Sequence, residues 1–389
     1  MKKILHAAAI VAALSIPAAA TAERHVDISG AGAQKMSVGI SVANPAFAHT
    51  LARNLELSGL FKIDRKGSVR VTGAPGAIRA EGGGKSVASN EPFSDDKSAR
   101  MAARRFSDAM VAEFSNGAQK GFACDRILFL NRGRQQAKGA SVPSEMCLAY
   151  PDGADIRQLT SDAKMTIFPR WHGNGRVLYI SDRNGAPQVW EMDLASGNRS
   201  VKWSLKGTPA GIAVSPDGSK IAAILSAHGN PELYVITGSR VVRLTETPLA
   251  SEGQPAWSPD GRKIAYVSNE TRHPQIYVID VATKAKRRLT SIGRENVDPD
   301  WGPDGRIAYI TKRGGSQVAV MNPAEGDSSA KLLTGPANWE HPSWSRDGRH
   351  LTANRDKAIF SLDSMEDGDE PKMLFISKGN NFISPCWAR

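Results

Sequence analysis

The sequence predicts a mainly β protein in which a small α/β domain precedes a six-bladed β-propeller. The first observation is a tryptophan that returns every 43 or 44 residues, with Val214 in one of its places. The tryptophans are Trp171, Trp257, Trp301, Trp344 and Trp387. A glycine and a proline keep the same period: Gly175, Gly218, Gly261, Gly305 and Gly348, and Pro169, Pro255, Pro299, Pro342 and Pro385. A β-rich repeat of about 40–45 residues is typical of propeller blades.

Each repeat contains the pieces of a four-stranded sheet. In QPAWSPDGRKIAYVS (254–268), the residues Ser258 to Gly261 suit a tight turn, because proline presets φ and glycine takes the positive φ that closes it. The residues before the turn predict an inner strand, and KIAYVS, QIYVID and KRRLT predict the second, third and fourth strands. The tryptophans suit packing between blades better than ligand binding, because their spacing follows the repeat.

The two ends of residues 121–389 are expected to share one blade. RILFL (126–130), EMCLAY (145–150) and DIRQLT (155–160) resemble a blade without its inner strand, while NFISPCWAR ends the chain as an inner strand without a blade. The last strand should therefore complete the first blade, which closes the ring and removes two exposed edges.

Residues 23–120 lack the period and predict the α/β domain. KMSVGISV (35–42) predicts a strand, and PAFAHTLARNLELSG (45–59) predicts a helix with an apolar stripe of Phe47, Leu51 and Leu55. Residues 94–117 predict a second helix with Ser94 as its cap. The Gly-rich stretch 72–92 between them is flexible by composition. Its GGGKS lacks the first glycine of a phosphate-binding loop, since residue 79 is Arg.

Residues 1–22 predict a secretory signal peptide, because two lysines precede a short apolar stretch that ends in small residues at Ala20-Thr21-Ala22. An uncleaved anchor is the alternative, but the stretch is short for a membrane span. The net charge of +11 is spread along the chain. We interpret it as solvated surface and expect no nucleic-acid partner for an exported protein.

Motifs for catalysis are absent from the sequence. It contains no G-x-S-x-G, H-E-x-x-H or C-x-x-C, and its eight histidines are scattered. A propeller hydrolase is one alternative function, and it would need carboxylates or histidines converging on a metal in the central channel. A scaffold for an unrelated envelope complex is another.

The signal peptide, LARNLELSGLFKID, SEMCLAYPDGADIRQLT, the PAWSPDGRKIAYVS repeats and the terminal ISPCWAR together resemble the TolB family of the Tol-Pal system. The resemblance covers residues 23–389. It implies a monomeric, non-catalytic periplasmic binding protein without cofactors, which supports outer-membrane integrity and constriction at division. The implied partners are the peptidoglycan-associated lipoprotein Pal, the protein TolA, and other outer-membrane or peptidoglycan-associated proteins. The α/β domain is shorter than the family pattern, with the Gly-rich stretch where further strands and a helix are expected.

Strand order places the loops that lead into the inner strands at one mouth of the channel, opposite the Pro-Asp-Gly turns. The resemblance implies that Pal docks on this ring, with contacts at Thr208, Gly211 and Gly253. The expected ring consists of Thr208, Gly211, Glu252, Gly253, Gln254, Glu295, Asn296, Asp298, Asn338, Glu340 and His341. The alternative is that these residues only complete the loops.

The segment after the signal peptide, ERHVDISG (23–30), alternates Val26 and Ile28 with polar residues, a pattern that suits strand addition to a partner's sheet. The resemblance implies that it binds TolA through Glu23, Arg24, His25, Val26, Asp27 and Ile28. An ordinary edge strand or a disordered tail is the alternative.

The three cysteines leave two possibilities open. Cys124 and Cys386 fall near the gap between the shared strands of the first blade, and Cys147 falls at the other end of that sheet. A Cys124–Cys386 bridge would fasten the ring in an oxidising compartment. Three buried free thiols are the alternative.

Overall fold

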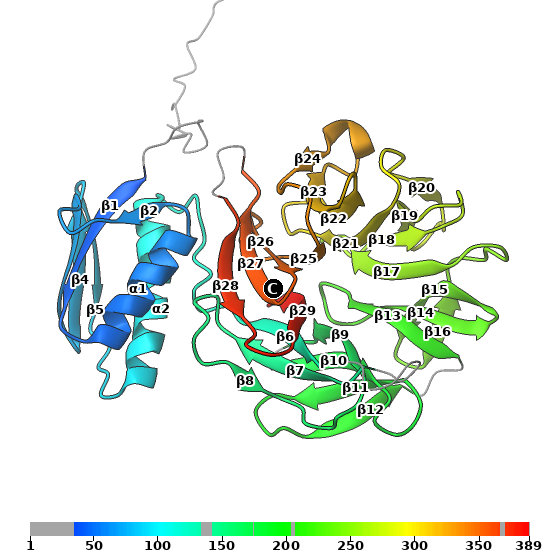
Figure 1. Cartoon of the computed structure of the whole chain (residues 1–389), viewed down its shortest axis with the longest axis horizontal. Helices are drawn as coiled ribbons and strands as arrows, with labels where there is room; N and C mark the ends of the chain where they lie inside the picture. The colour runs from blue at the N-terminus through cyan, green and yellow to red at the C-terminus, as the bar shows by residue number, and fades with distance from the viewer. Residues whose placement is uncertain (1–34, 134–141, 174, 204–206, 366–369, 389) are drawn as a thin grey trace, which may run out of the picture.

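The computed structural model describes residues 35–133, 142–173, 175–203, 207–365 and 370–388. It consists of a five-stranded sheet with two helices at the N-terminal end and a ring of six four-stranded sheets (Figure 1). The predicted fold class, a six-bladed propeller after a small α/β domain, is therefore confirmed. No helix among these residues is long and apolar enough to cross a membrane.

The N-terminal sheet has the strand order β2-β1-β3-β4-β5, with β1 parallel to both neighbours and the other pairs antiparallel. Both helices lie on the face of the sheet that is turned toward the propeller (Figure 1). The elements are β1 (Met36–Val42), α1 (Pro45–Leu57), β2 (Phe61–Ile63), β3 (Val69–Ala74), β4 (Ala77–Gly82), β5 (Lys85–Ser89) and α2 (Asp96–Phe114).

The helices begin and end where local signals place them. The Asn44 side chain accepts a hydrogen bond from the Phe47 backbone N–H at 2.8 Å and caps α1, and Gly59 beyond its end has a φ of 73°. The cap of α2 is Asp95 rather than the predicted Ser94, because the Asp95 carboxylate accepts from the Ser98 backbone N–H at 2.7 Å. The Ser98 hydroxyl oxygen in turn accepts a hydrogen bond from the Asp95 backbone N–H, so the two residues form a reciprocal capping box.

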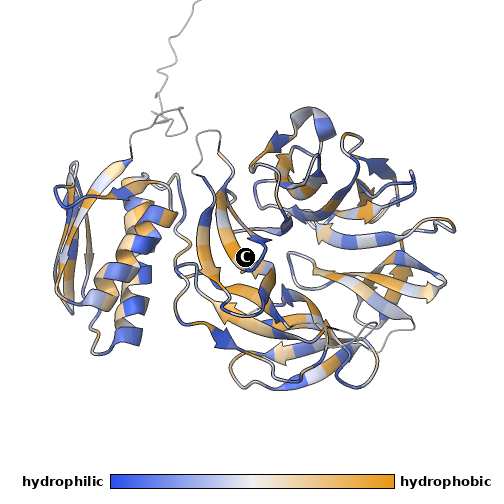
Figure 2. Cartoon of the chain, in the orientation of Figure 1, coloured by the Kyte–Doolittle hydropathy of each residue, from blue (hydrophilic) through white to orange (hydrophobic). Residues whose placement is uncertain are grey.

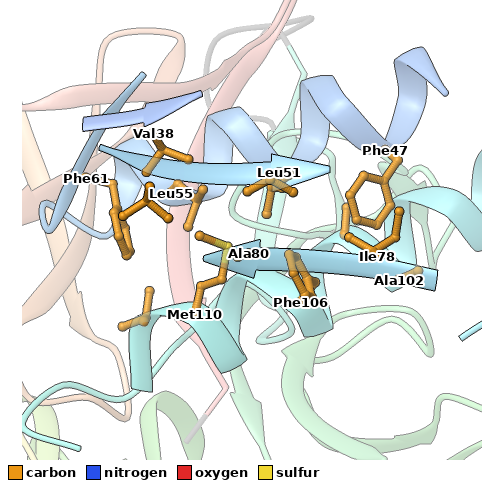
Figure 3. Close-up of a cluster of buried hydrophobic side chains, with 14 of the residues drawn as sticks. Val38, Phe47, Leu51, Leu55, Phe61, Ile78, Ala80, Ala102, Phe106 and Met110 are labelled. Atoms are coloured by element: carbon orange, nitrogen blue, oxygen red, sulfur yellow. The ribbon is translucent and has the colours of Figure 1, made fainter. Parts of the chain in front are cut away.

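The predicted apolar stripe of α1 forms the core of the domain. Phe47, Leu51 and Leu55 are at most 1% exposed and pack with Phe106 of α2 and Val38 of β1 (Figure 3). Because one stripe of each helix meets one face of the sheet, the two layers bury a single hydrophobic core.

The Gly-rich stretch is not a flexible loop, so that part of the sequence prediction is wrong. It forms β3, β4 and β5, joined by tight turns in which glycines such as Gly76 and Gly84 adopt positive φ. These strands are short, but buried and exposed residues alternate along β3 and β4, and Val71, Ile78 and Ala80 are buried. Glycine is common in flexible segments, but here it adopts the positive φ that closes hairpins.

The GGGKS motif lies at the β4–β5 turn and has a structural role. The Lys85 ammonium donates to the carbonyls of Glu113 at 2.8 Å and Phe114 at 3.1 Å, at the end of α2. A cation at a helix C-terminus satisfies carbonyls that the helix leaves unpaired.

Each blade consists of four antiparallel strands, numbered from the channel outward. Blade 1 is β29 (Asn381–Trp387), β6 (Ile127–Arg132), β7 (Ser144–Ala149) and β8 (Arg157–Gln158), and blade 2 is β9 (Thr166–Trp171), β10 (Arg176–Ser181), β11 (Gln188–Asp193) and β12 (Arg199–Trp203). Blade 3 is β13 (Thr208–Val214), β14 (Ile221–His228), β15 (Asn230–Thr237) and β16 (Arg240–Arg243), and blade 4 is β17 (Glu252–Trp257), β18 (Lys263–Ser268), β19 (Gln275–Asp280) and β20 (Lys286–Arg288). Blade 5 is β21 (Asn296–Trp301), β22 (Ile307–Lys312), β23 (Ser316–Met321) and β24 (Lys331–Leu332), with the 3₁₀ turn Gly326–Ser329, and blade 6 is β25 (Trp339–Trp344), β26 (His350–Arg355), β27 (Ala358–Asp363) and β28 (Lys372–Ile376).

The predicted sharing of blade 1 between the chain ends is confirmed. Strand β29 pairs with β6, with Cys386 opposite Leu128 and Trp387 opposite Ile127. Apolar residues of neighbouring blades pack together in shared clusters. Figure 2 shows hydrophobic colouring along the blade strands. The ring therefore closes through hydrogen bonds of the last strand.

The repeated tryptophans join neighbouring blades, as predicted. The Trp257 indole N–H donates to the carbonyl of Ala213 in β13 at 3.1 Å, and the Trp344 indole N–H donates to the carbonyl of Asp300 in β21 at 3.1 Å. Trp171 makes the same bond across the closure, to the carbonyl of Cys386 at 3.2 Å. Each of these three acceptors is the residue just before the tryptophan position of the preceding blade. Trp301 differs, because its indole N–H donates to the Gly305 carbonyl of its own blade at 2.9 Å.

The Ser-Pro-Asp-Gly turns form as predicted. In blade 4 the Gly261 N–H donates to the Ser258 carbonyl at 2.9 Å, and Gly261 has a φ of 68°. The Ser258 hydroxyl donates to the Asp260 carboxylate at 2.6 Å, and that carboxylate accepts from the Arg262 N–H at 3.0 Å. The repeated aspartate is thus a part of the turn.

Candidate docking site at the channel mouth

The inner strands surround a central cavity of about 640 Å³. It extends from the loops that lead into the inner strands to the Pro-Asp-Gly turns, since Gln254 and His341 line one end and Pro216 and Pro259 line the other. A volume of this size lies in the range of binding sites for small molecules or side chains of a partner. We call the end that contains Gln254 and His341 the channel mouth.

A bulge interrupts every inner strand at the channel mouth. In five blades the residue before the repeated proline has a left-handed backbone, with φ between 46° and 53°. These residues are Phe168, Gln254, Asp298, His341 and Ser384. Left-handed backbone is uncommon outside glycine and costs roughly 1–3 kcal/mol for each residue. The bulge turns the side chains of these five residues toward the cavity, which all five line.

Three of the five bulge residues are linked by hydrogen bonds across neighbouring blades. The Gln254 amide donates to the Asp298 carboxylate, and its carbonyl oxygen accepts from the Asp298 backbone N–H at 3.1 Å. The Asp298 carboxylate also accepts from the His341 backbone N–H at 3.1 Å and lies 3.2 Å from His341 Nδ1. Asp298 therefore holds the bulges of blades 4, 5 and 6 in one arrangement.

Asp298 and His341 stabilise each other's charged form. Burial opposes charge on the Asp298 carboxyl, but the His341 imidazolium overcomes this and lowers the pKa of Asp298 below its ordinary value. Burial likewise opposes charge on His341, and the Asp298 carboxylate raises the pKa of His341 above its ordinary value. The pair favours a carboxylate beside an imidazolium.

The structure divides the predicted ring by exposure. The exposed members are Thr208, Asn338 and Glu340, and the half-buried ones are Gly253, Gln254, Glu295, Asp298 and His341. Gly211, Glu252 and Asn296 are buried. At Gly211 an added Cβ would approach Pro255 Cδ to 3.2 Å, so this glycine allows the inner strands of blades 3 and 4 to come close.

Two buried members of the ring serve the fold and cannot contact a partner directly. Asn296 is 0% exposed, and its amide donates to Gln275 Oε1 at 2.8 Å and to the Ile292 carbonyl at 3.0 Å. Glu252 is 4% exposed and accepts from the Thr247 hydroxyl at 2.8 Å. Burial raises the pKa of Glu252 to about 7. The sequence did not reveal that their strands point these side chains inward.

Two residues of the channel mouth and two exposed residues of the loops that lead into the inner strands are absent from the predicted ring. Phe168 and Ser384 precede the repeated prolines just as Gln254, Asp298 and His341 do, so aligning the repeats by proline would have identified them. Leu249 and Ile292 stand in the loops that lead into blades 4 and 5 and are 101% and 51% exposed. Nothing in the sequence marks them, because isolated aliphatic residues are usually buried.

The alternative of a propeller hydrolase would need carboxylates or histidines converging on a metal. Among the described residues, no group of three or more His, Cys, Asp or Glu side chains is arranged to hold a metal ion. Asp347 and His350, which lie 2.6 Å apart at a Pro-Asp-Gly-type turn, are buried within blade 6 and pack near Phe122.

Within the described residues, no disulfide joins Cys124 to Cys386 or to Cys147. The strand register places Cys386 opposite Leu128, four residues beyond Cys124. Cys124 instead lies against α2, where its backbone N–H donates to Asp108 at 3.1 Å. Burial raises the pKa of the Cys124 and Cys147 thiols to about 12. The predicted TolA segment, Glu23 to Ile28, lies outside the described residues.

Comparison with known proteins identifies the family. Residues 117–388 match the family model of the TolB beta propeller domain. The protein TolB homolog of Protochlamydia amoebophila is 30% identical over 243 residues, which cover 57% of this chain and 52% of the relative. The Tol-Pal system protein TolB of Anaeromyxobacter dehalogenans is 31% identical over 166 residues, which cover 42% of this chain and 36% of the relative. The alignments thus span about half or less of these curated relatives.

A crystal structure of TolB from Acinetobacter baumannii has the same fold. It matches with a TM-score of 0.76 and 21% identity, over 91% of this chain and 97% of that chain. The repeat, the shared first blade and the match of the family model to residues 117–388, well over half of the chain, lead to one conclusion: the protein belongs to the TolB beta-propeller domain family.

Proposed function

We propose that the protein is a non-catalytic periplasmic component of the Tol-Pal system that docks Pal at the channel mouth and TolA through residues 23–28. In this proposal residues 1–22 are a signal peptide, residues 23–120 form the N-terminal domain and residues 121–389 form the propeller. The role is to support outer-membrane integrity and constriction at cell division. Family membership and the form of the channel mouth support this proposal.

The observation that carries the proposal is the linked set of left-handed bulges. A binding surface made of loops loses affinity when the loops must be ordered on binding. At the channel mouth, Asp298 joins Gln254 and His341 before any partner arrives. The exposed side chain of Glu340 stands next to His341 on β25 and is therefore held in place, and Thr208 begins β13 of blade 3, next to blade 4. Backbone strain that a structure retains is typical of functional sites.

The Pal proposal is tested with two exposed residues of the ring. Thr208→Lys combined with Glu340→Lys places positive charge on blades 3 and 6 without burying it. Glu252 is unsuitable for this test, because a lysine there would be buried and would destabilise the fold. We expect the double variant to bind purified Pal at least about tenfold more weakly, measured by titration calorimetry.

A matched control lies on the opposite face of the propeller. Ser239→Lys with Glu325→Lys makes the same change in net charge at exposed turns between third and fourth strands. This control should bind Pal like the wild type. Wild-type affinity in the ring variant, or equal weakening in both variants, would contradict docking at the channel mouth.

The TolA proposal is tested by deletion of residues 23–30 from the mature chain. The segment's alternating pattern suits addition of a strand to a partner's sheet. We expect the shortened protein to lose TolA in a pull-down experiment and to keep its affinity for Pal. Loss of both partners, or of neither, would count against the assignment of this segment.

A further inference from the structure

Strand β20 and the turn before it form an exposed segment rich in positive charge. Residues 282–288, ATKAKRR, are all exposed and contain four Lys or Arg and no Asp or Glu. Residues 262–288 together contain seven Lys or Arg and two Asp or Glu. The sequence suggested that the charge is spread, but the fold gathers it, because β18, β19 and β20 pair side by side. We call six of these exposed cations the basic edge: Arg262, Lys263, Lys284, Lys286, Arg287 and Arg288. The seventh, Arg272, lies in the β18–β19 turn at the other end of these strands.

The two acidic residues neutralise little of this charge. The Asp280 carboxylate accepts from the backbone N–H groups of Ala282 at 3.0 Å and Thr283 at 2.9 Å, so it is occupied within the β19–β20 turn. The Thr283 hydrogen bonds lower the pKa of Asp280, which therefore stays charged as a part of the turn. Glu270 pairs with Lys286 alone, at 2.6 Å. In the described part of the chain, Lys284 and Arg288 have no ion-pair partner.

Protection of a sheet edge does not require this much charge. Lysines on an outermost strand discourage pairing with other chains. The other five outermost strands contain only one or two Lys or Arg each, as in β16 (RVVR) and β28 (KMLFI), whereas all three residues of β20 are basic. The excess of positive charge on the outermost strand of blade 4 therefore indicates a binding role.

The position of the basic edge indicates the kind of partner. Four of its six residues lie on the outermost strand of blade 4 or in the turn before it, and Arg262 and Lys263 lie at the β17–β18 turn. None of the six lines the central cavity. A convex surface with many separate cations suits an extended anionic surface better than one phosphate group in a pocket. In the ring of six, blade 4 stands opposite blade 1, so β20 lies on the far side of the propeller from the N-terminal sheet and helices (Figure 1).

We propose that the basic edge rests on an anionic phospholipid bilayer, with the N-terminal domain directed away from that bilayer. This proposal relies on export of the protein and not on Pal or TolA docking. The attraction acts only within about 10 Å at ordinary ionic strength, so contact is reversible and sensitive to salt. No residue of the basic edge lines the channel mouth, so the mouth stays open to a protein partner while the basic edge touches lipid.

The test is co-sedimentation of the mature chain with lipid vesicles. The wild type should bind vesicles of phosphatidylcholine and phosphatidylglycerol in equal amounts, and should not bind vesicles of phosphatidylcholine alone. Lys284→Glu with Arg288→Glu should weaken binding at least about tenfold, because each cation near the surface contributes separately. Neutral Gln at the same two positions should give an intermediate result, which guards against an effect of misfolding.

The matched control is Arg65→Glu with Lys66→Glu, at exposed positions of the N-terminal domain with the same change in net charge. It should bind vesicles like the wild type. The proposal would be overturned if the two Glu variants lost vesicle binding equally. It would also be overturned if inorganic phosphate displaced the wild type from vesicles while chloride at the same ionic strength did not. A wild type that fails to bind anionic vesicles at low salt would likewise overturn it. The Lys284/Arg288 variant should keep its affinity for Pal, so this proposal and Pal docking fail separately.

Discussion

At the scale of single residues, the channel mouth depends on one carboxylate. Asp298 accepts hydrogen bonds from two neighbouring blades while its own backbone is left-handed. Its partner His341 is 30% exposed at the side chain, whereas Asp298 is 10% exposed, so the pair is reachable by solvent from one side. Such a pair converts a change in pH into a change in loop stability.

The stability that His341 contributes should depend on pH. Because its pKa is raised in the folded protein, the contribution is complete below the unfolded pKa of about 6.5 and is lost as the pH rises through the raised value. Because the pKa of Asp298 is lowered, its contribution is complete above about 3.9 and is lost only in stronger acid. His341→Gln should therefore cost about 1–2 kcal/mol of unfolding free energy near pH 5 and clearly less near pH 9.

The control for this prediction is the same substitution made in an Asp298→Asn protein. Without the carboxylate, the pH dependence of the His341→Gln cost should largely disappear in urea unfolding at several pH values. An equal pH dependence in both backgrounds would show that Asp298 is not its cause.

At the scale of strands, closure of the ring relies on β29. Its Trp387 is 1% exposed and packs against Phe122 with ring centroids 5.3 Å apart. The Trp387 backbone N–H also donates to the Ser343 hydroxyl of blade 6 at 3.2 Å. One strand therefore joins the last blade to the first through both packing and hydrogen bonds.

Trp387→Ala should open this closure. Removal of a buried tryptophan leaves a cavity and should cost about 3–5 kcal/mol of unfolding free energy, measured by denaturant titration. Trp203→Ala is the comparison, because Trp203 is half-buried on the outermost strand of blade 2. This substitution should lower the unfolding free energy clearly less. If the two costs were equal, closure by β29 would have no special weight in stability.

At the scale of the whole molecule, the N-terminal domain is bound to the propeller by a buried ionic cluster. Arg104 of α2 is 0% exposed and contacts Asp152 of the β7–β8 turn with Nε–Oδ2 at 2.7 Å and Nη2–Oδ1 at 3.0 Å. The same guanidinium lies 3.7 Å from the centre of the Tyr150 ring and also reaches Asp155. Leu57 of α1 joins the core of blade 1. The two domains therefore share one buried interface.

Arg104→Met should weaken this interface strongly. It would leave the Asp152 carboxylate, which is 2% exposed, without its main partner, and loss of one member of a buried pair costs about 3–5 kcal/mol. We expect lower thermal stability and faster trypsin cleavage in residues 115–126, between α2 and the propeller. Adding Asp152→Asn should recover part of the loss, because no buried charge would remain unpaired. A double variant as unstable as the single one would argue that Arg104 acts through packing alone.

The sequence by itself determined the number of blades and their register. Tryptophan, proline and glycine hold fixed places in each repeat because a blade must pack against its neighbour and turn at the same points. The place of the C-terminal strand could be predicted by counting strands. The sequence has six inner strands and a first blade that lacks one, so the last inner strand must complete the first blade. The stripe of α1 was equally clear from spacing alone. These features depend on local or periodic patterns of residues, so they can be predicted from the sequence alone.

Only the tertiary structure decided which side chains of the ring are exposed. Asn296 and Glu252 are expected in exposed loops, yet they begin β21 and β17 and are buried. The link of Gln254, Asp298 and His341 joins residues 43 or 44 positions apart, and the Arg104–Asp152 pair joins two domains. The hairpins β3 to β5 form because helices cover their apolar face, although their glycines suggested a loop. Burial and contacts between distant segments depend on how the elements pack, and no local pattern of residues records that packing.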